Sequence, residues 1–204
     1  ARVGLRRLRS ALKHFSNWSE HINPAWESEL ADIFRALGQS RDHDAIRDSV
    51  IPLIKKVCDF DFALSSNTDP ELATRLSNTQ TTQLFLSLLS FIYSENEAKT
   101  KLSKQVAKSL SKLYHKILKD ASQFPELSIE QQHRTRKRVK QLRYCIDFTA
   151  GLYPEKQVQQ FLDKLQPIQE YLGFYNDLFV AEQIFQQQVS EKPEFLFALG
   201  WVKA

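Results

Sequence analysis

The sequence predicts an all-α protein. Its apolar residues recur with the spacing of one helix face, and no alternating apolar and polar run bounded by turn residues indicates a strand. Only five glycines occur in 204 residues, and we expect about eight helices, joined by short connections apart from a polar stretch near residues 65–78.

Proline and glycine mark the helix boundaries in the first part of the chain. Asn23 before Pro24, and Asp69 before Pro70, have the pattern of an N-cap followed by a first helical turn. Gly38 follows a leucine and stands where a helix would bend or stop.

Similar signals divide the second part of the chain. Ser128 and Gln131 have the pattern of a capping box, which would open a helix containing the stretch "HRTRKRVKQLRY", residues 133–144. Pro154 would begin the next helix, and Gly173 follows a leucine where a helix would bend or stop.

The composition is that of an ordinary globular protein, with 42% hydrophobic and 25% charged residues. No apolar run is long enough for a membrane helix and no signal peptide is visible, so we expect no membrane partner and a cytoplasmic location. Cys58 and Cys145 provide neither a disulfide framework nor metal-ligand spacing. Because the chain starts at Ala1 and contains no Met, we expect the native start to lie upstream.

Basic residues are gathered into two parts of an otherwise acidic chain. Residues 1–13 and 99–143 hold 18 of the 28 Lys and Arg residues and only three of the 24 acidic residues. The net charge is only +4, but the uneven distribution of basic and acidic residues along the chain suggests a polyanionic partner.

Two helices would each present a row of positive charge within these parts. At about 3.6 residues per turn the members of a row share one helix face over roughly 15 Å, and like charges at this spacing repel by roughly a few tenths of a kcal/mol per pair. A ligand with repeated negative charge would turn this repulsion into attraction. The first basic array is Arg2, Arg6, Arg9 and Lys13, and the second basic array is His133, Arg136, Lys140 and Arg143.

Residues 101–120 place a further row of lysines along one helix side, which is either a solvated face or an extension of the basic site. Tyr144, beside Arg143, could orient an oxyanion or could pack, and His133 could become cationic beside a phosphate or be an ordinary first-turn histidine. The lysine row consists of Lys101, Lys104, Lys108, Lys112, either His115 or Lys116, and Lys119.

The two arrays belong to an internal repeat. A shift of 134 residues places Arg2, Arg6 and Arg9 on Arg136, Lys140 and Arg143, and it keeps the apolar stripe Leu5, Leu8 and Leu12 in phase. The phrases "LGQSRDHD" from Leu37 and "LGFYNDLF" from Leu172 agree at a shift of 135 residues. We therefore expect two related helical bundles, about residues 1–122 and 123–204.

Catalytic motifs are not found: there is no glycine-rich phosphate loop, zinc-binding helix motif or nucleophile signature, and Asp42 and Asp177 support a metal site only weakly. We expect a binding module with no catalytic residue, metal or cofactor. A general polyanion-binding or nucleic-acid-binding protein is the alternative, because phosphate contacts give affinity to any basic groove. Against sequence-specific nucleic-acid binding, there is no recognition-helix module and no aromatic residue interleaved for base stacking.

The phrases "RVGLRRLR" and "HRTRKRVKQLRY", with "LGxxxD" in each half, resemble the CHAD domain, the conserved histidine α-helical domain, over nearly the whole chain. The resemblance implies two four-helix bundles related by a pseudo-twofold axis, with a basic channel between them that binds inorganic polyphosphate. It also implies either a place after a CYTH triphosphatase domain or a role in targeting to polyphosphate granules.

The resemblance carries site residues onto matching positions. The family histidine of the second half is His133, whereas that of the first half would fall two residues before Ala1, so we expect a truncated first helix. Gln141 replaces a residue that is usually basic in the family and is not included. With the lysine row added, the predicted polyphosphate-binding residues are Arg2, Arg6, Arg7, Arg9, Lys13, Lys108, Lys112, Lys116, Lys119, His133, Arg136, Lys140, Arg143 and Tyr144.

Overall fold

The computed structural model describes residues 2–16, 19–37, 39–58, 72–94 and 102–204, and these residues form helices and no strand. Eight of the α-helices in this part of the chain have nine or more residues, which agrees with the expected number. None of the described helices is both long enough and apolar enough to cross a membrane. The all-α prediction is confirmed.

The chain forms two compact units. Unit 1 comprises residues 1–35 and 71–169, and unit 2 comprises residues 36–70 and 170–204. The predicted repeat of two four-helix bundles stays a prediction, and helices from both predicted halves lie in unit 1. Unit 1 contains α1 (Arg2–Phe15), most of α2 (Ala25–Ala36), α5 (Leu72–Leu76), α6 (Thr79–Tyr93), α7 (Leu102–Ser122), the 3-10 helix η1 (Phe124–Glu126), α8 (Ile129–Thr149), the 3-10 helix η2 (Ala150–Leu152) and the first part of α9 (Glu155–Gln188).

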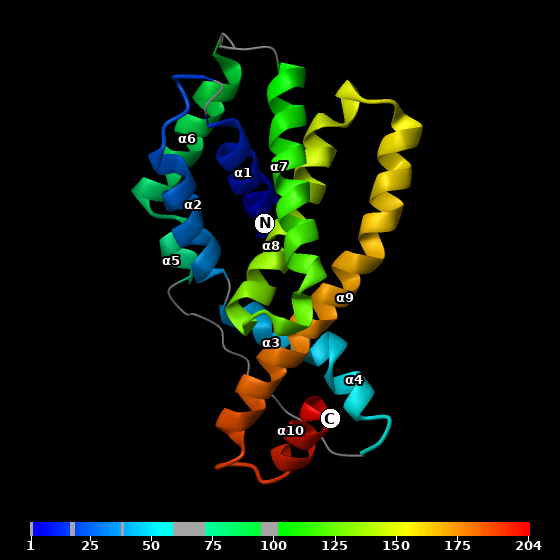
Figure 1. Ribbon diagram of the computed structural model, residues 1–204. Helices are drawn as coiled ribbons and strands as arrows, with labels where there is room; N and C mark the ends of the chain where they lie inside the picture. The colour runs from blue at the N-terminus through cyan, green and yellow to red at the C-terminus, as the bar shows by residue number, and fades with distance from the viewer. Residues whose placement is uncertain (1, 17–18, 38, 59–71, 95–101) are drawn as a thin grey trace. The chain divides into compact units, whose positions relative to one another are not determined.

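The core of unit 1 is built around α8, which packs against both α1 and α7 (Figure 1). Leu5 and Leu12 of α1 are buried, as are Val139 and Leu142 of α8, so the predicted apolar stripes do face the core. These contacts hold the two helices that carry the basic arrays side by side.

Unit 2 has its own core, formed by α3 (Gln39–Ser49), α4 (Ile51–Ile54), the end of α9 and α10 (Phe195–Lys203). Ile46, Phe185 and Phe195 are among its most deeply buried side chains, and the rings of Phe185 and Phe195 lie 5.4 Å apart between centroids. The burial of these aromatic and branched side chains is the main favourable contribution to the stability of this unit.

Most of the predicted helix starts that fall on described residues are confirmed by hydrogen bonds. The Asn23 side chain accepts a bond from the Ala25 amide at 2.9 Å, and Ser128 and Gln131 make both bonds of a capping box. Helix α9 begins directly after Pro154, as expected. The signals at Asp69-Pro70 and at Gly38 lie outside the described residues.

A helix stop at Gly173 is wrong, because α9 continues through this residue to Gln188. A glycine inside a helix costs only about 1 kcal/mol relative to alanine, and burial of its neighbour Leu172 outweighs a cost of that size. Tertiary packing therefore overrides the local preference here.

Candidate anion-binding site

Helix α1 gathers its cations around one aromatic ring of α2. The guanidinium carbons of Arg2, Arg6 and Arg9 lie 4.5, 5.3 and 5.4 Å from the centroid of the Phe34 ring. Cation–π attraction offsets part of the repulsion between like charges that share such a small volume. The first basic array is therefore a convergent group of charges on the surface of unit 1.

Glu27 of α2 holds the other end of this array. Its Oε1 atom accepts hydrogen bonds from Nε and Nη2 of Arg9 at 3.1 and 2.8 Å, and the Lys13 ammonium lies 3.4 Å away. Burial by itself would raise the pKa of Glu27, but the Arg9 hydrogen bond and the charges of Lys13 and Arg9 outweigh it and lower the pKa. Arg9 and Lys13 are thus already arranged around one oxyanion.

Helix α8 adds a further cation, Lys137, to the charges of α1. Burial lowers the pKa of Lys137, and the neighbouring charges of Lys13, Arg136 and Arg9 lower it further. Like charges from two helices therefore meet on one surface of unit 1. We call this group the cation cluster; its members are Arg2, Arg6, Arg9, Lys13, Arg136 and Lys137.

The remaining predicted residues of the second basic array extend the cluster along α8. His133 and Lys140 are half-buried and share a helix face with Arg136 and Lys137, since they lie three or four residues apart. The Arg143 Nη1 atom donates to Oε1 of Gln169 at 3.0 Å, which fixes the guanidinium on the same side of α8. Tyr144 is half-buried beside it.

Arg7 lies away from this group. Its Nη1 atom is 3.9 Å from Oδ2 of Asp147, and its guanidinium lies 5.4 Å from the centroid of the Phe148 ring. One residue along a helix is a rotation of about 100°, so Arg7 points to a different side of α1 from Arg6. The structure brings Arg7 to α8 but not to Phe34.

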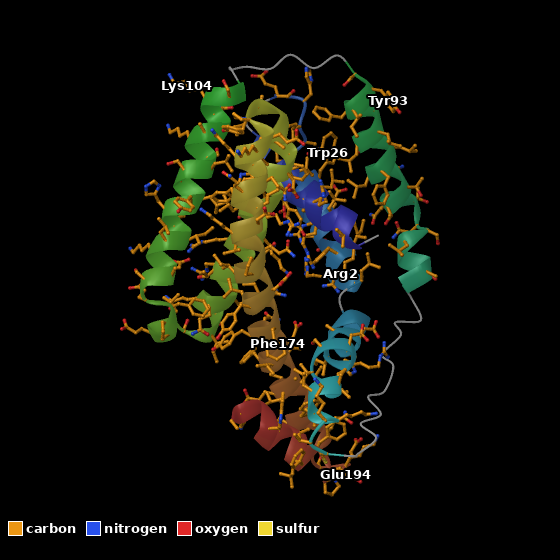
Figure 2. All side chains as sticks on the ribbon, turned by 90° about the vertical axis from the view of Figure 1, so that its right-hand side faces the viewer. Arg2, Trp26, Tyr93, Lys104, Phe174 and Glu194 are labelled. Atoms are coloured by element: carbon orange, nitrogen blue, oxygen red, sulfur yellow. The ribbon has the colours of Figure 1, made fainter. Side chains whose placement is uncertain are left out.

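The predicted lysines of α7 are exposed and face away from the buried side of their helix, where Val106, Leu113 and Ile117 lie. Figure 2 shows Lys104 on α7 and Arg2 on α1, with α8 between the two helices in this view. Lys116 and Lys119 line a groove between α7 and α8, whereas Lys108 and Lys112 do not.

Three residues that matter for the cluster were missed by the sequence reasoning. Lys137 could have been found, because it lies four residues after His133 and three before Lys140, on the same helix face. Glu27 and Phe34 gave no such signal, since only tertiary packing brings α2 to the first basic array.

Within the residues that the structure describes, no three His, Cys, Asp or Glu side chains come close enough together to hold a metal ion.

Comparisons with known proteins agree on one family. A family model described as the CHAD domain matches residues 1–186. The crystal structure of the CHAD domain from the plant Ricinus communis is similar, with a TM-score of 0.75 and 27% sequence identity over 98% of this chain and 73% of that chain. No curated protein matches the chain.

Proposed function

We propose, from the premise that the chain belongs to the CHAD family, that it binds inorganic polyphosphate through the cation cluster on α1 and α8. His133, Lys140, Arg143 and Tyr144 would continue the contact along α8. The proposed role is binding without hydrolysis, either beside a CYTH-type triphosphatase domain or as a granule-targeting module.

One observation carries the proposal: the guanidinium groups of Arg2, Arg6 and Arg9 converge on the Phe34 ring, and the basic helix α8 packs against the helix that carries them. Such an arrangement is unfavourable in the absence of an anion, because each like-charge contact raises the free energy of the folded state. A bound polyanion reverses the sign of this energy. The arrangement therefore favours a ligand with closely spaced negative charges.

Polyphosphate fits this requirement better than a nucleic acid. It carries about one negative charge per phosphate and has no bases to recognise, and arginine forks make bidentate contacts with phosphate oxygens. Phe34, the aromatic ring at the cluster, already contacts three guanidinium groups and is not offered to a nucleobase. Arg7, Lys108, Lys112, Lys116 and Lys119 would contact only a chain that extends beyond the cluster.

Charge reversal at two positions tests the location of the site. We expect Arg6→Glu or Lys140→Glu to weaken polyphosphate binding by about tenfold or more, because each replaces an attractive charge by a repulsive one at a phosphate contact. The matched controls Arg35→Glu and Lys164→Glu make the same substitutions at exposed positions of unit 1. Equal losses in test and control variants would mean that only the overall charge matters.

A competition titration at fixed ionic strength tests the class of ligand. Sized polyphosphates, single-stranded DNA, duplex DNA and heparin compete with a labelled long-chain polyphosphate at about 0.15 M salt. We expect affinity to rise with polyphosphate chain length and then level off, because successive contacts are intramolecular. If duplex DNA displaces polyphosphate at equal phosphate concentration, the protein is a general polyanion binder.

A further inference from the structure

A second group of cations lines a groove between α7 and α8 that has a volume of about 300 Å³. Two lysines come from the last turns of α7, and two arginines come from the first half of α8. The residues that line the groove include Lys116, Lys119, Asp120, Gln131, Arg134 and Arg138.

The walls of this groove are fixed by contacts between the two helices. Asp120 of α7 accepts hydrogen bonds from Arg138 and from the Thr135 hydroxyl, the latter at 2.9 Å, and forms an ion pair with Arg138. The Gln132 side chain donates to the Phe124 carbonyl of the connecting turn at 3.1 Å. The groove is therefore built on packed helices and a bonded turn.

The described side chains that line the groove carry an excess of positive charge. Asp120 balances the charge of Arg138, but Lys116, Lys119 and Arg134 form no ion pair with any residue that the structure describes. Arg134 and the lysines are exposed, so their side chains have room to turn toward a ligand. Among the residues that the structure describes, no aromatic side chain lines the groove, so these residues offer nothing for a nucleobase to stack on.

The groove lies on a different side of α8 from Arg136 of the cation cluster, and Lys137, three residues after Arg134, lies between the two faces. Arg134 and Arg138 are each two residues from Arg136, and at about 100° per residue this places both nearly opposite Arg136 around the helix axis. A ligand in the groove would therefore not contact the α1 arginines at the same time unless it passed around α8.

We propose that this groove is a second anion site, which takes a compact oligophosphate of two or three phosphate groups. Its volume lies at the lower limit for small-molecule sites and is suited to a short ligand. Three unbalanced cations match the multiple negative charges of pyrophosphate or tripolyphosphate, and the Arg134 fork can bind one phosphate in a bidentate manner. The ligand is either a free oligophosphate or the end of a longer chain, and the site does not depend on the cluster binding polyphosphate.

Calorimetric titration of the whole chain with tripolyphosphate, at about 0.15 M salt, tests the proposal. The groove variant is Lys119→Glu with Arg134→Glu, and the cluster variant is Arg6→Glu with Lys140→Glu. We expect two tripolyphosphates per wild-type chain and one per chain of either variant, with groove affinity reduced by at least about tenfold in the groove variant. Because Lys119 and Arg134 are exposed and form no ion pair with a described residue, the circular dichroism and melting of the groove variant should stay near wild type.

The outcomes separate this proposal from the function proposed above. An unchanged isotherm in the groove variant would overturn the second site, and so would a wild-type stoichiometry of one that the cluster variant abolishes and the groove variant leaves unchanged. A cluster variant that keeps full affinity for long polyphosphate while the groove variant loses tripolyphosphate would overturn the cluster and support the groove. Long-chain polyphosphate that fails to compete with tripolyphosphate in the cluster variant would identify free oligophosphate as the ligand, whereas competition would identify a chain end.

Discussion

A phosphate bound at the cation cluster would have to compete with the Glu27 carboxylate for Arg9 and Lys13. The substitution Glu27→Gln tests this competition. The carboxylate already occupies the Arg9 fork and lies beside Lys13. Glutamine keeps the shape of the side chain and removes its negative charge. We expect polyphosphate affinity to rise and stability to fall slightly.

The expected gain in affinity follows from Coulomb's law. A phosphate held by Arg9 and Lys13 would lie about 6 Å from the carboxylate, where the repulsion is about 0.7 kcal/mol in water and about 3 kcal/mol at a protein-surface dielectric constant of about 20. With 27% of its side chain exposed, Glu27 is partly screened, so a repulsion of about 1 kcal/mol is reasonable. Its removal would tighten binding about fivefold.

Stability should move in the opposite direction. Without the carboxylate, Arg9 and Lys13 repel each other and the partly exposed ion pairs are lost, which costs about 1 kcal/mol or less. Because the pKa of Glu27 is lowered in the folded state, its contribution to stability is present above its ordinary pKa of 4.5 and is lost as the pH falls through the lowered value. The difference in melting temperature between variant and wild type should therefore vanish in strong acid.

The assay is a competition titration with sized polyphosphate at fixed ionic strength, together with thermal melting. Glu29→Gln is the matched control, because it changes the net charge equally at an exposed position of the same helix. An equal gain in the Glu29 variant would assign the effect to net charge. A loss of affinity in the Glu27 variant would refute the reasoning and show that Glu27 holds Arg9 in its binding position.

Two other side chains give predictions about the core of unit 1. Burial, followed by the charge of Lys13, lowers the pKa of His14, so the neutral form is favoured and stability should fall as the pH drops below 6.5. Urea denaturation at pH 7.5 and 5.5 measures the fall in the free energy of unfolding between the two pH values. This fall should be smaller in His14→Gln than in the wild type and unchanged in the control His21→Gln. Equal falls in His14→Gln and the wild type would show that His14 is not the group responsible. Burial raises the pKa of Cys145 to about 12, so only Cys58 should react with a thiol reagent until the protein is unfolded. Two reactive thiols in the native wild-type protein, or one in native Cys58→Ser, would show that Cys145 is accessible.

The sequence by itself determined that the protein is helical and which faces of α1 and α8 carry charge. The capping box at Ser128 and the burial of Val139 and Leu142 could be predicted, because capping and helical periodicity depend on residues within a few positions of each other. The family could be recognised for the same reason, since its motifs are short and local.

Only the tertiary structure decided how the charges combine. Phe34 beneath three arginines, Glu27 between Arg9 and Lys13, and Lys137 near Lys13 all depend on contacts between helices that are distant in the sequence. Their positions follow from how buried side chains pack together, and a helical period carries no information about which neighbouring helix a face will meet.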